Sequence, residues 1–577
     1  MFTTRFLQVL LLSSLAVAWV ELDPAIIPAL DEPLEVYSLG DPSFLPYEWL
    51  EGIVGNVAHG VKFTRRQDGS SESRDYAYNG EEPVGFVDRS TGETQVYADY
   101  EKLPAASGTI DINNAFNNLV LPDDDTHTEL VQGSSLVGST ANDITDDDLS
   151  KRWNDEEPDS VFLTNAIFQR WIECGGKKFP VCGPGSRARF GVGAGNKVFS
   201  LSYRWKPAKK SGKMVKANPA KVAQDIKKAL EGKGRVKVKH VDTCYYDSGA
   251  QYIQPVYRVL AEGLPEDNDH NATESSDILR FFPIGDEPVE NLLSGGAVAS
   301  SGAQPGHVDP KNNQHTEVAR SLKPNYFEAR ASLYERVAKP FITVGRYITD
   351  NDIHQDEFLA NADGFWSNLA SSTAIEFADA QYYFAPSWMY GKDSPSYVNS
   401  VNLALTEAHG WKHLFSTSQG SPAISPVVIP DTIPVEGYGR ISNNHGRLAY
   451  WIIDAGEVIP APIDFPSDPA ARRRAFEPWQ RVFRGGMHAV MGWRTKNLFE
   501  DNVAADTARG IAANRPVAAA WLDAADNDWV YASWPVFEWP PYGRAAVIFP
   551  CGRGSDRVSA LGGLGKPTCL RMRYWDN

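Results

Sequence analysis

Short apolar runs separated by polar loops follow one another through the last 240 residues of the chain. The pattern predicts a strand at "FITVGRYI", a helix at "ANADGFWSNLAS", and further strands at "AQYYFAP", "SVNLALTEAHG" and "AYWIIDAG". It then predicts a helix leading into a strand at "FEPWQRVFRGGMHAVMGW", a helix at "RPVAAAWLDAAD" and a last strand at "GRAAVIFP". Helices that alternate with uninterrupted apolar runs are typical of a mostly parallel sheet covered by helices. We therefore expect an α/β domain over residues 336–577.

The preceding third of the chain predicts a smaller α+β module over residues 153–262. The stretches "RARFGVG", "KVFSLSYRW" and "GRVKVKHV" alternate as strands do, and "NPAKVAQDIKKAL" has helical spacing with Pro219 in its first turn. Residues 263–335 are poor in apolar side chains and are interpreted as a linker or a long surface excursion. Within residues 19–152 the clearest local signal is "VGFVDRSTGETQVY", which predicts a hairpin.

Charge divides these regions sharply. Residues 21–150 hold 26 Asp and Glu against six Lys and Arg, whereas residues 175–240 hold 18 Lys and Arg against Asp225 and Glu231. The basic surface is interpreted either as a face that binds anions or nucleic acid, or as a face that docks against the acidic segment or is solvated. We favour the second interpretation, because the lysines lack interleaved aromatic residues and the acidic partner lies in the same chain. The net charge of −17 argues against nucleic-acid binding by the whole molecule.

The first residues predict entry into the secretory pathway. An apolar core follows Arg5, and the small residues Ala16-Val17-Ala18 follow the core, which is the pattern of a signal peptide over residues 1–18. The alternative is an uncleaved anchor, but the apolar core is short for a membrane span. We expect a secreted protein with no membrane span after signal removal. The dibasic pair Lys151-Arg152 ends the acidic segment, which is either a pro-region removed by a processing protease or an uncut acidic loop.

An oxidising compartment favours disulfides. The simplest connectivity pairs Cys174 with Cys182 and Cys551 with Cys569, and it leaves Cys244 unpaired, although sequence alone does not fix the connectivity. Asn271 in "HNATES" is the one Asn-x-Ser/Thr sequence, and we expect it to be glycosylated.

Two strand ends in the α/β domain carry the candidate chemistry. "LALTEAHG" ends on His409 and Gly410, and "YWIIDAGE" ends on Asp454, Gly456 and Glu457. Ligands of open α/β sheets gather at the carboxyl ends of the strands, so that His409 is placed for acid/base work with Asp454 or Glu457. Each residue also has a structural interpretation: His409 in ordinary loop hydrogen bonds, Asp454 capping a turn and Glu457 facing solvent. Gly410, Trp411 and Gly456 are the candidate substrate-binding neighbours.

A strand ending in His-Gly, followed by a strand ending in a short Asp-Ala-x turn, resembles the layout of caspase-like cysteine peptidases of the legumain and gingipain group. Several stretches are more closely similar to an uncharacterised secreted family with such a core, a domain of unknown function. They are "GPGSRARFGVGAGNKVFSLSYRW", "YYDSGAQYIQPVYRVLAE", "SYVNSVNLALTEAHG", "YWIIDAGEVI", "FRGGMHAVMGW" and "GRAAVIFPCGRGSDRVSALGGLG". The resemblance spans most of residues 160–570 and implies a caspase-like α/β domain behind an α+β module.

The resemblance implies that His409 is the general base and that Gly456 occupies the position of the nucleophilic cysteine. Glycine has no side chain to attack an acyl group, so that the sequence departs from the family where peptidase chemistry needs a thiolate. We expect a binding or accessory protein or a pseudoenzyme, with an unknown ligand or protein partner. The alternative is an enzyme, such as a cyclase, isomerase or hydrolase, that uses His409 with Asp454 or Glu457. We expect no metal or cofactor, because no carboxylate near His409 and His413 completes a ligand set.

Overall fold

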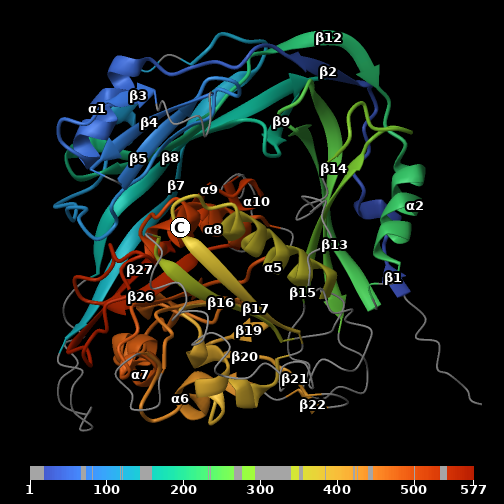
Figure 1. Cartoon of the computed structure of the whole chain (residues 1–577). Helices are drawn as coiled ribbons and strands as arrows, with labels where there is room; N and C mark the ends of the chain where they lie inside the picture. The colour runs from blue at the N-terminus through green and yellow to red at the C-terminus, as the bar shows by residue number, and fades with distance from the viewer. Residues whose placement is uncertain are drawn as a thin grey trace, which may run out of the picture.

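A computed structural model of the chain shows a sheet that arches over a group of helices (Figure 1). It describes residues 19–65, 73–80, 82–116, 119, 121–142, 159–231, 233, 235–264, 276–292, 339–349, 355–383, 385–419, 423–424, 426–439, 446–498, 501–532 and 542–576. Continuous pairing joins 22 of the strands in these residues.

Five parallel strands form the centre of the α/β part, in the order β17–β16–β18–β24–β25. Their bounds are Glu376–Tyr383 for β17, Phe341–Ile348 for β16, Leu403–Glu407 for β18, Tyr450–Asp454 for β24 and Ala489–Trp493 for β25. The strands β18, β24 and β25 are buried along their whole length, which explains why their sequences are uninterrupted apolar runs. The mixed α/β class is therefore confirmed, with parallel pairing throughout this central part of the sheet.

Helices cover both faces of this sheet. One face packs against α5 (Gln355–Ala370), α8 (Val503–Ala512) and α9 (Val517–Asn527), after which α10 (Trp529–Ala532) follows. The other face packs against α6 (Ile429–Thr432) and α7 (Ala471–Phe483). Small strands complete the loops beyond β18: β19 (Gly410–Trp411), β20 (Leu414–Phe415), β21 (Ser418–Gln419), β22 (Ala423–Ile424) and β23 (Val427–Val428).

Beyond β25 the sheet becomes antiparallel and leaves the α/β part. The pairing runs β25–β26–β27–β7–β8–β10–β11–β6–β5–β4–β3, with α1 packed on its far end. The bounds are Ala545–Pro550 (β26), Cys569–Asp576 (β27), His127–Asn142 (β7), Ser160–Cys174 (β8), Arg187–Gly193 (β10), Lys197–Arg204 (β11), Thr94–Val96 (β6), Glu82–Asp88 (β5), Arg74–Asn79 (β4), Phe63–Arg65 (β3) and Tyr47–Val57 (α1). The predicted hairpin at residues 84–97 is β5–β6 and is confirmed.

A second branch of the sheet begins at β9, which pairs with both β8 and β13. From there β13 pairs with β1 and β14, β14 pairs with β15 and β2, β2 pairs with β12, and α2 covers one side. The bounds are Lys177–Cys182 (β9), Arg235–Asp247 (β13), Trp19–Glu21 (β1), Tyr252–Leu264 (β14), Ser276–Pro283 (β15), Leu34–Leu39 (β2), Ala208–Val215 (β12) and Pro219–Leu230 (α2). Pro219 opens α2, as predicted, and Asn218 caps the helix by accepting from the backbone N–H of Lys221.

The two branches close around the helices. In Figure 1, β7 and β8 rise along one side, β2 and β12 cross the top, and β14 and β13 descend on the other side, with α5 and α8–α10 inside the arch. Glu357 on α5 accepts hydrogen bonds from Lys233 (3.0 Å) and Arg280 (3.1 Å), and these bonds tie the helix to the descending branch. The arch is therefore fastened to the α/β part at both of its feet, through β27 on one side and α5 on the other.

The acidic segment, residues 21–150, contributes strands to both branches of the sheet. Some of its carboxylates form ion pairs with lysine and arginine side chains of the basic region, residues 175–240. Just before the basic region, Arg170 donates to Asp124 at 2.8 Å in a buried pair. Inside the region, Arg187 pairs with Glu93, Lys178 with Glu129 and Lys237 with Glu21. The interpretation that the basic face docks against the acidic segment is confirmed for these pairs. One apolar core combines residues of 19–152 with residues of 153–262, so that the two predicted domains share a core instead of forming separate ones.

Part of the predicted linker is ordered structure. Strand β15 lies inside residues 263–335 and pairs with β14 over eight residues, so that the linker prediction is wrong for this stretch. Its alternating sequence "SDILRFFP" is short, and the polar residues on both sides obscure it. The signal peptide, Lys151, Arg152 and Asn271 lie outside the described residues, and these predictions stay predictions. In the described part of the chain, no helix is both long and apolar enough to span a membrane.

One predicted disulfide is wrong and the other is confirmed. The bonds join Cys182 to Cys244 and Cys551 to Cys569, whereas Cys174 is free. The hairpin of β8 and β9 places Cys174 opposite Lys177, so that Cys182 lies five residues further along β9, about 16 Å away at the rise of a strand. The parallel pairing of β9 with β13 instead brings Cys182 beside Cys244, with 6.3 Å between their Cα atoms. Two disulfides are compatible with an oxidising compartment.

We expect peptide mapping without reduction to recover the peptide of Cys182 joined to the peptide of Cys244. Cys174 should take up an alkylating reagent after unfolding in denaturant without reductant, because it is the chain's one thiol outside a disulfide. Digestion with trypsin and mass spectrometry, with and without reductant, measures both results. Recovery of Cys174 joined to Cys182 would contradict the pairing.

Candidate functional site

The candidate site lies where the strand order reverses. The chain leaves β16 through α5 to reach β17 on one side and then returns to β18 on the other. In open α/β sheets ligands bind in the crevice outside the carboxyl ends of the strands at such a point. The residues that follow β18, β24 and β25 are therefore the first place to look for chemistry.

His409 follows β18 by two residues and is half-buried. Its ring meets Phe358 of α5 edge-on, with 5.5 Å between the ring centres. Its carbonyl oxygen accepts from the backbone N–H of Ser416 at 2.8 Å, in the loop that β19 and β20 form. The imidazole thus stands at the edge of the sheet on the side of α5, as the sequence predicts for a strand-end histidine.

Gly410 and Gly456 are in close contact across the two strand ends. A Cβ at Gly410 would lie 2.5 Å from the carbonyl oxygen of Gly456 and 2.8 Å from the Cβ of Ala455, so that only glycine fits. A Cβ at Gly456 would point elsewhere, to within 3.1 Å of Asn497 Oδ1 and 3.3 Å of the Lys496 Cα. The backbones of the two predicted site segments do come together, and a side chain at position 456 would face the loop after β25.

Asp454 is buried at the end of β24. Its Oδ1 accepts from the indole N–H of Trp493 at 2.6 Å and from the amide of Asn497 at 2.9 Å. Its Oδ2 has no hydrogen-bond partner among the described residues. Burial raises the pKa of Asp454 to about 6, although both bonds oppose the rise. Its two hydrogen bonds thus come from Trp493 and Asn497. The acid/base role of Asp454 with His409 stays a prediction.

Sequence reasoning missed Glu407, the neighbour of Asp454. The two residues are register partners on adjacent parallel strands, and both side chains are buried. Neither carboxyl oxygen of Glu407 has a partner with normal hydrogen-bond geometry in the described part of the chain. Burial raises the pKa of Glu407 well above its usual value, and the charges of Asp454 and Asp501 raise it further. In the sequence, the sign of this residue is a glutamate inside the apolar run "LALTEA". A charged residue at such a place normally indicates the start of a loop.

Two more buried acids continue from this pair toward α10. Asp501 accepts from the Tyr531 hydroxyl at 2.6 Å and from the backbone N–H of Val503. Asp528 accepts from two backbone N–H groups, and burial raises its pKa to about 7. Burial also raises the pKa of Asp501, and the charge of Asp454 contributes. The charges of Asp454 and Asp501 raise the pKa of Glu407, and those of Asp454 and Asp528 raise the pKa of Asp501. Buried acids that act on one another in this way favour their protonated forms, because ionised neighbours in an apolar core repel each other.

The other candidate residues lie in the loops that follow β18 and β24. Glu457 has a left-handed backbone (φ 59°) and is half-buried; burial raises its pKa, with Lys496 and Lys412 opposing. Trp411 is 45% exposed. His413 stacks against Phe465, and burial lowers its pKa to about 4, so that it is neutral at physiological pH. No group of three or more Asp, Glu, His or Cys side chains in the described residues could hold a metal ion.

Comparisons with known proteins add little to this geometry. No family model matches the chain, and no curated protein matches it. Among solved structures, the chain is similar to an uncharacterised protein from Eubacterium rectale, with 10% sequence identity and a TM-score of 0.24. The match covers 48% of this chain and 90% of that protein, and a similarity at this level carries no argument about family or function.

Proposed function

We propose that the chain is a secreted protein with a caspase-like α/β domain that lacks cysteine-peptidase activity and acts by binding a ligand or a protein partner. The observation that carries the proposal is Gly456. It stands after β24, beside the loop of His409, at the position that the caspase-like layout gives to the nucleophile. Acyl transfer by that layout needs a thiolate next to the imidazole, and no side chain at this position can supply one.

The distribution of the cysteines supports the same proposal. Four of the chain's five cysteines form disulfides, and a disulfide sulfur is not a thiolate nucleophile. Cys244, which the simplest connectivity leaves unpaired, is bonded to Cys182. The remaining thiol, Cys174, ends β8 and packs against the core of the second sheet branch, together with α2.

A second candidate function rests on the pair of Glu407 and Asp454. Enzymes hold carboxyl groups protonated near neutral pH by burying them beside one another, and such groups act as acids or bases. An enzyme of this kind, a cyclase, isomerase or hydrolase, would use His409 as the base with Asp454 or Glu457. We place it second because the side chains of Glu407 and Asp454 are both fully buried.

The purified secreted protein should leave a peptide library uncleaved, also in the presence of a reducing agent. Two variants make this measurement decisive: His409→Ala removes the imidazole, and Cys174→Ser removes the one free thiol. Wild type and both variants should give the same baseline in mass-spectrometric product analysis. Turnover of peptides that disappears in Cys174→Ser would overturn the proposal, and turnover of peptide, ester or small-molecule substrates that disappears in His409→Ala alone would favour the second candidate.

A further inference from the structure

Four aromatic rings follow one another on β4, on β5 and just after β6. The ring centres of Tyr78 and Tyr76 are 5.7 Å apart, and those of Tyr76 and Phe86 are 6.2 Å apart. Tyr97 follows, 6.4 Å from Phe86. None of the four belongs to an apolar core of the described residues, and Tyr76 and Tyr78 are half-buried. Core packing therefore does not account for this aromatic row.

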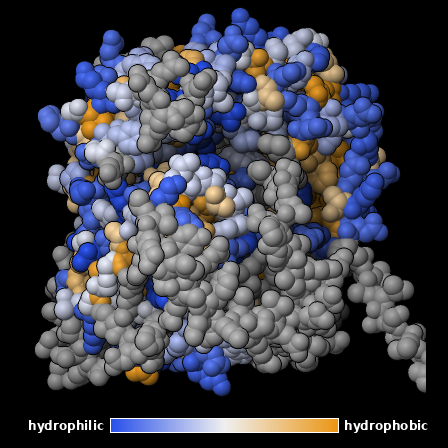
Figure 2. Space-filling view, viewed as in Figure 1, coloured by the Kyte–Doolittle hydropathy of each residue, from blue (hydrophilic) through white to orange (hydrophobic). Residues whose placement is uncertain are grey.

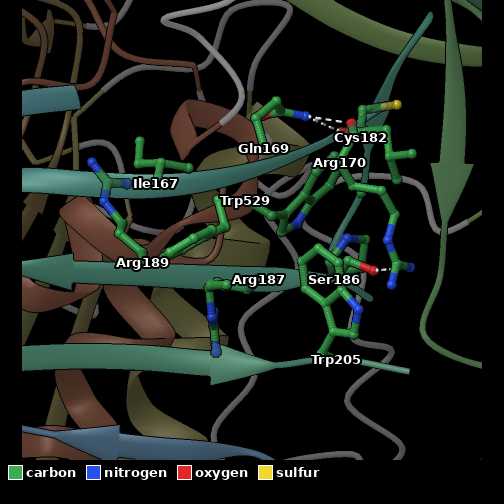
Figure 3. A pocket seen from close by; sticks show the side chains of 14 residues that line it. Ile167, Gln169, Arg170, Cys182, Ser186, Arg187, Arg189, Trp205 and Trp529 are labelled. Carbon is green, nitrogen blue, oxygen red and sulfur yellow. Dashed lines mark hydrogen bonds between the residues drawn. The ribbon is translucent and has the colours of Figure 1, made fainter. Parts of the chain in front are cut away.

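The aromatic row lies on the face of the sheet that points to the helices. Phe86 is the register partner of Gln95, Gln95 of Ser202, and Ser202 of Arg189, and register partners of antiparallel strands point to the same side. Arg189 pairs with Asp526 of α9 at 2.7 Å. Figure 2 shows the molecule hollowed between the upper strands and these helices, and Figure 3 shows the surroundings of Arg189 from close by. The aromatic row thus continues the inner wall of the arch.

Polar side chains that solvent reaches flank the rings. The Arg74 side chain is 32% exposed and donates to Asp88 at 2.9 Å. The Glu93 side chain is 22% exposed and accepts from Gln95 at 2.8 Å and from Arg187 at 3.2 Å. These bonds hold the groups in place and use only part of their capacity, because a guanidinium has five donors and a carboxylate about four acceptor sites. The wall therefore offers both donors and acceptors, and its charges are paired.

At Tyr97 the aromatic row reaches a cavity of about 100 Å³ between the arch and the turn that joins α8 to α9. Lys102 and Asp99 line it and pair at 2.5 Å. Arg515 lies over the Tyr97 ring, 3.5 Å from its centre, and pairs with a buried aspartate of α9. Asn79, at the turn of the β4–β5 hairpin, adds an amide group. The cavity is therefore polar, and its charges are also paired.

From these observations we infer that the inner wall of the arch at β4–β6 binds a neutral carbohydrate chain. A sugar ring has C–H groups on its faces, which pack against aromatic rings, and hydroxyl groups around its rim, each of which donates and accepts. The rings of Tyr76 and Tyr78 pack against the faces of the sugar. Arg74, Glu93 and Gln95 form hydrogen bonds with its hydroxyl groups. A chain fits better than a single sugar, because the aromatic rings follow one another toward the cavity.

Other classes of guest fit this wall less well. An anion would meet the carboxylates of Glu93 and Asp99, and a cation would meet Arg74 and Lys102. A wholly apolar guest would remove water from these charged groups without replacing its hydrogen bonds, which is costly. The inference deepens the proposed binding function and rests on it, because it names a site and a class of ligand.

Isothermal titration calorimetry with neutral hexasaccharides tests the class of ligand. Laminarihexaose, cellohexaose, maltohexaose, mannohexaose and chitohexaose are the neutral probes, and hexagalacturonate is the anionic one. At least one neutral probe should bind the purified secreted protein, and hexagalacturonate should not. Tyr76→Ala should weaken that binding about tenfold, the effect of removing one stacked ring. Phe44→Ala is the control: Phe44 is 46% exposed and follows Ser43, which hydrogen-bonds Tyr203 on the opposite face of the sheet.

The outcomes separate this inference from the proposed function. No binding of any neutral probe, binding of hexagalacturonate alone, or equal affinity of the wild type and Tyr76→Ala would overturn the inference. If Tyr76→Ala unfolds early in a thermal melt, Tyr78→Ala replaces it and should weaken binding in the same way. Peptide cleavage by the wild type would overturn the proposed function alone, since it does not change which sugar binds the arch.

Discussion

Glu407→Gln is expected to raise the free energy of unfolding at pH 8 by about 1–3 kcal/mol and to leave it nearly unchanged at pH 4. Glu407 is fully buried without a well-formed hydrogen bond, and its pKa is raised above the usual value by burial and by Asp454 and Asp501. At pH 8 the carboxyl group of Glu407 is ionised in the unfolded protein. Folding of the wild type must therefore either protonate this group or bury its charge, and both cost free energy. Glutamine has the shape of the protonated acid and carries no such cost.

The sign of the pH dependence follows from the direction of the shifts. A carboxyl group whose pKa is higher in the folded than in the unfolded protein stabilises the fold below its unfolded pKa, and that stabilisation is lost as the pH rises through the folded pKa. For Asp454 the window runs from 3.8 to about 6, and for Asp528 from 3.8 to about 7. At 1.36 kcal/mol per pKa unit, each group contributes on the order of a few kcal/mol. The free energy of unfolding should therefore fall between pH 4 and pH 7.

Urea unfolding followed by tryptophan fluorescence at pH 4, 5, 6, 7 and 8 measures both effects. The control is Glu287→Gln, which makes the same chemical change at an exposed site and should leave the pH profile of the wild type unaltered. A loss of stability in Glu407→Gln at pH 8, or equal slopes of stability against pH in wild type and Glu407→Gln, would contradict a protonated carboxyl group at this position.

The sequence predicts the parts of the fold that local pattern determines. The runs "FITVGRYI" and "YWIID" are apolar on both faces because helices cover both sides of β16 and β24. Asn218 and Pro219 mark the start of α2 by capping chemistry that needs no distant partner. His409 and Asp454 were placed at strand ends for the same local reason.

The arch could not be predicted in this way, because its pairings join distant parts of the chain. Trp19 of β1 lies beside Arg235 of β13, and Asn142 of β7 lies beside Cys569 of β27. An alternating strand shows which residues face the core, but it does not show which distant strand it pairs with. The disulfide error has the same origin, since Cys182 meets Cys244 only after β9 joins β13.

Glu407 was missed for a different physical reason. A charged residue inside an apolar run normally marks the point where a strand leaves the core, because burying a carboxylate without a partner is costly. Here the residue stays inside as the register partner of Asp454. Violations of this kind often occur at functional sites, which is why the second candidate function deserves its own measurement.

Arg189→Leu is expected to lower the free energy of unfolding by about 3–5 kcal/mol at pH 8. Arg189 on β10 pairs with Asp526 near the end of α9 at 2.7 Å, and it also donates to the Asp526 backbone carbonyl. Both side chains of the pair are less than a tenth exposed, so that removing the guanidinium leaves a buried carboxylate without its counter-charge. Burial already raises the pKa of Asp526 to about 6 despite Arg189. Without Arg189 the carboxyl group should take up a proton, and the loss should be smaller at pH 5.

Two further variants decide whether the pair itself is responsible. Arg189→Leu with Asp526→Leu removes both charges and should recover most of the loss, since apolar replacements of a buried pair are often tolerated. Arg473→Leu breaks the exposed pair with Glu477 and should leave the free energy of unfolding nearly unchanged, because solvent screens an exposed ion pair. A loss in Arg189→Leu no larger than in Arg473→Leu would contradict the prediction.

Because Arg189 belongs to the arch and Asp526 to the helices inside it, calorimetry of the single variant also shows whether the two parts unfold together. One transition in the wild type and two in Arg189→Leu would mean that this pair couples them.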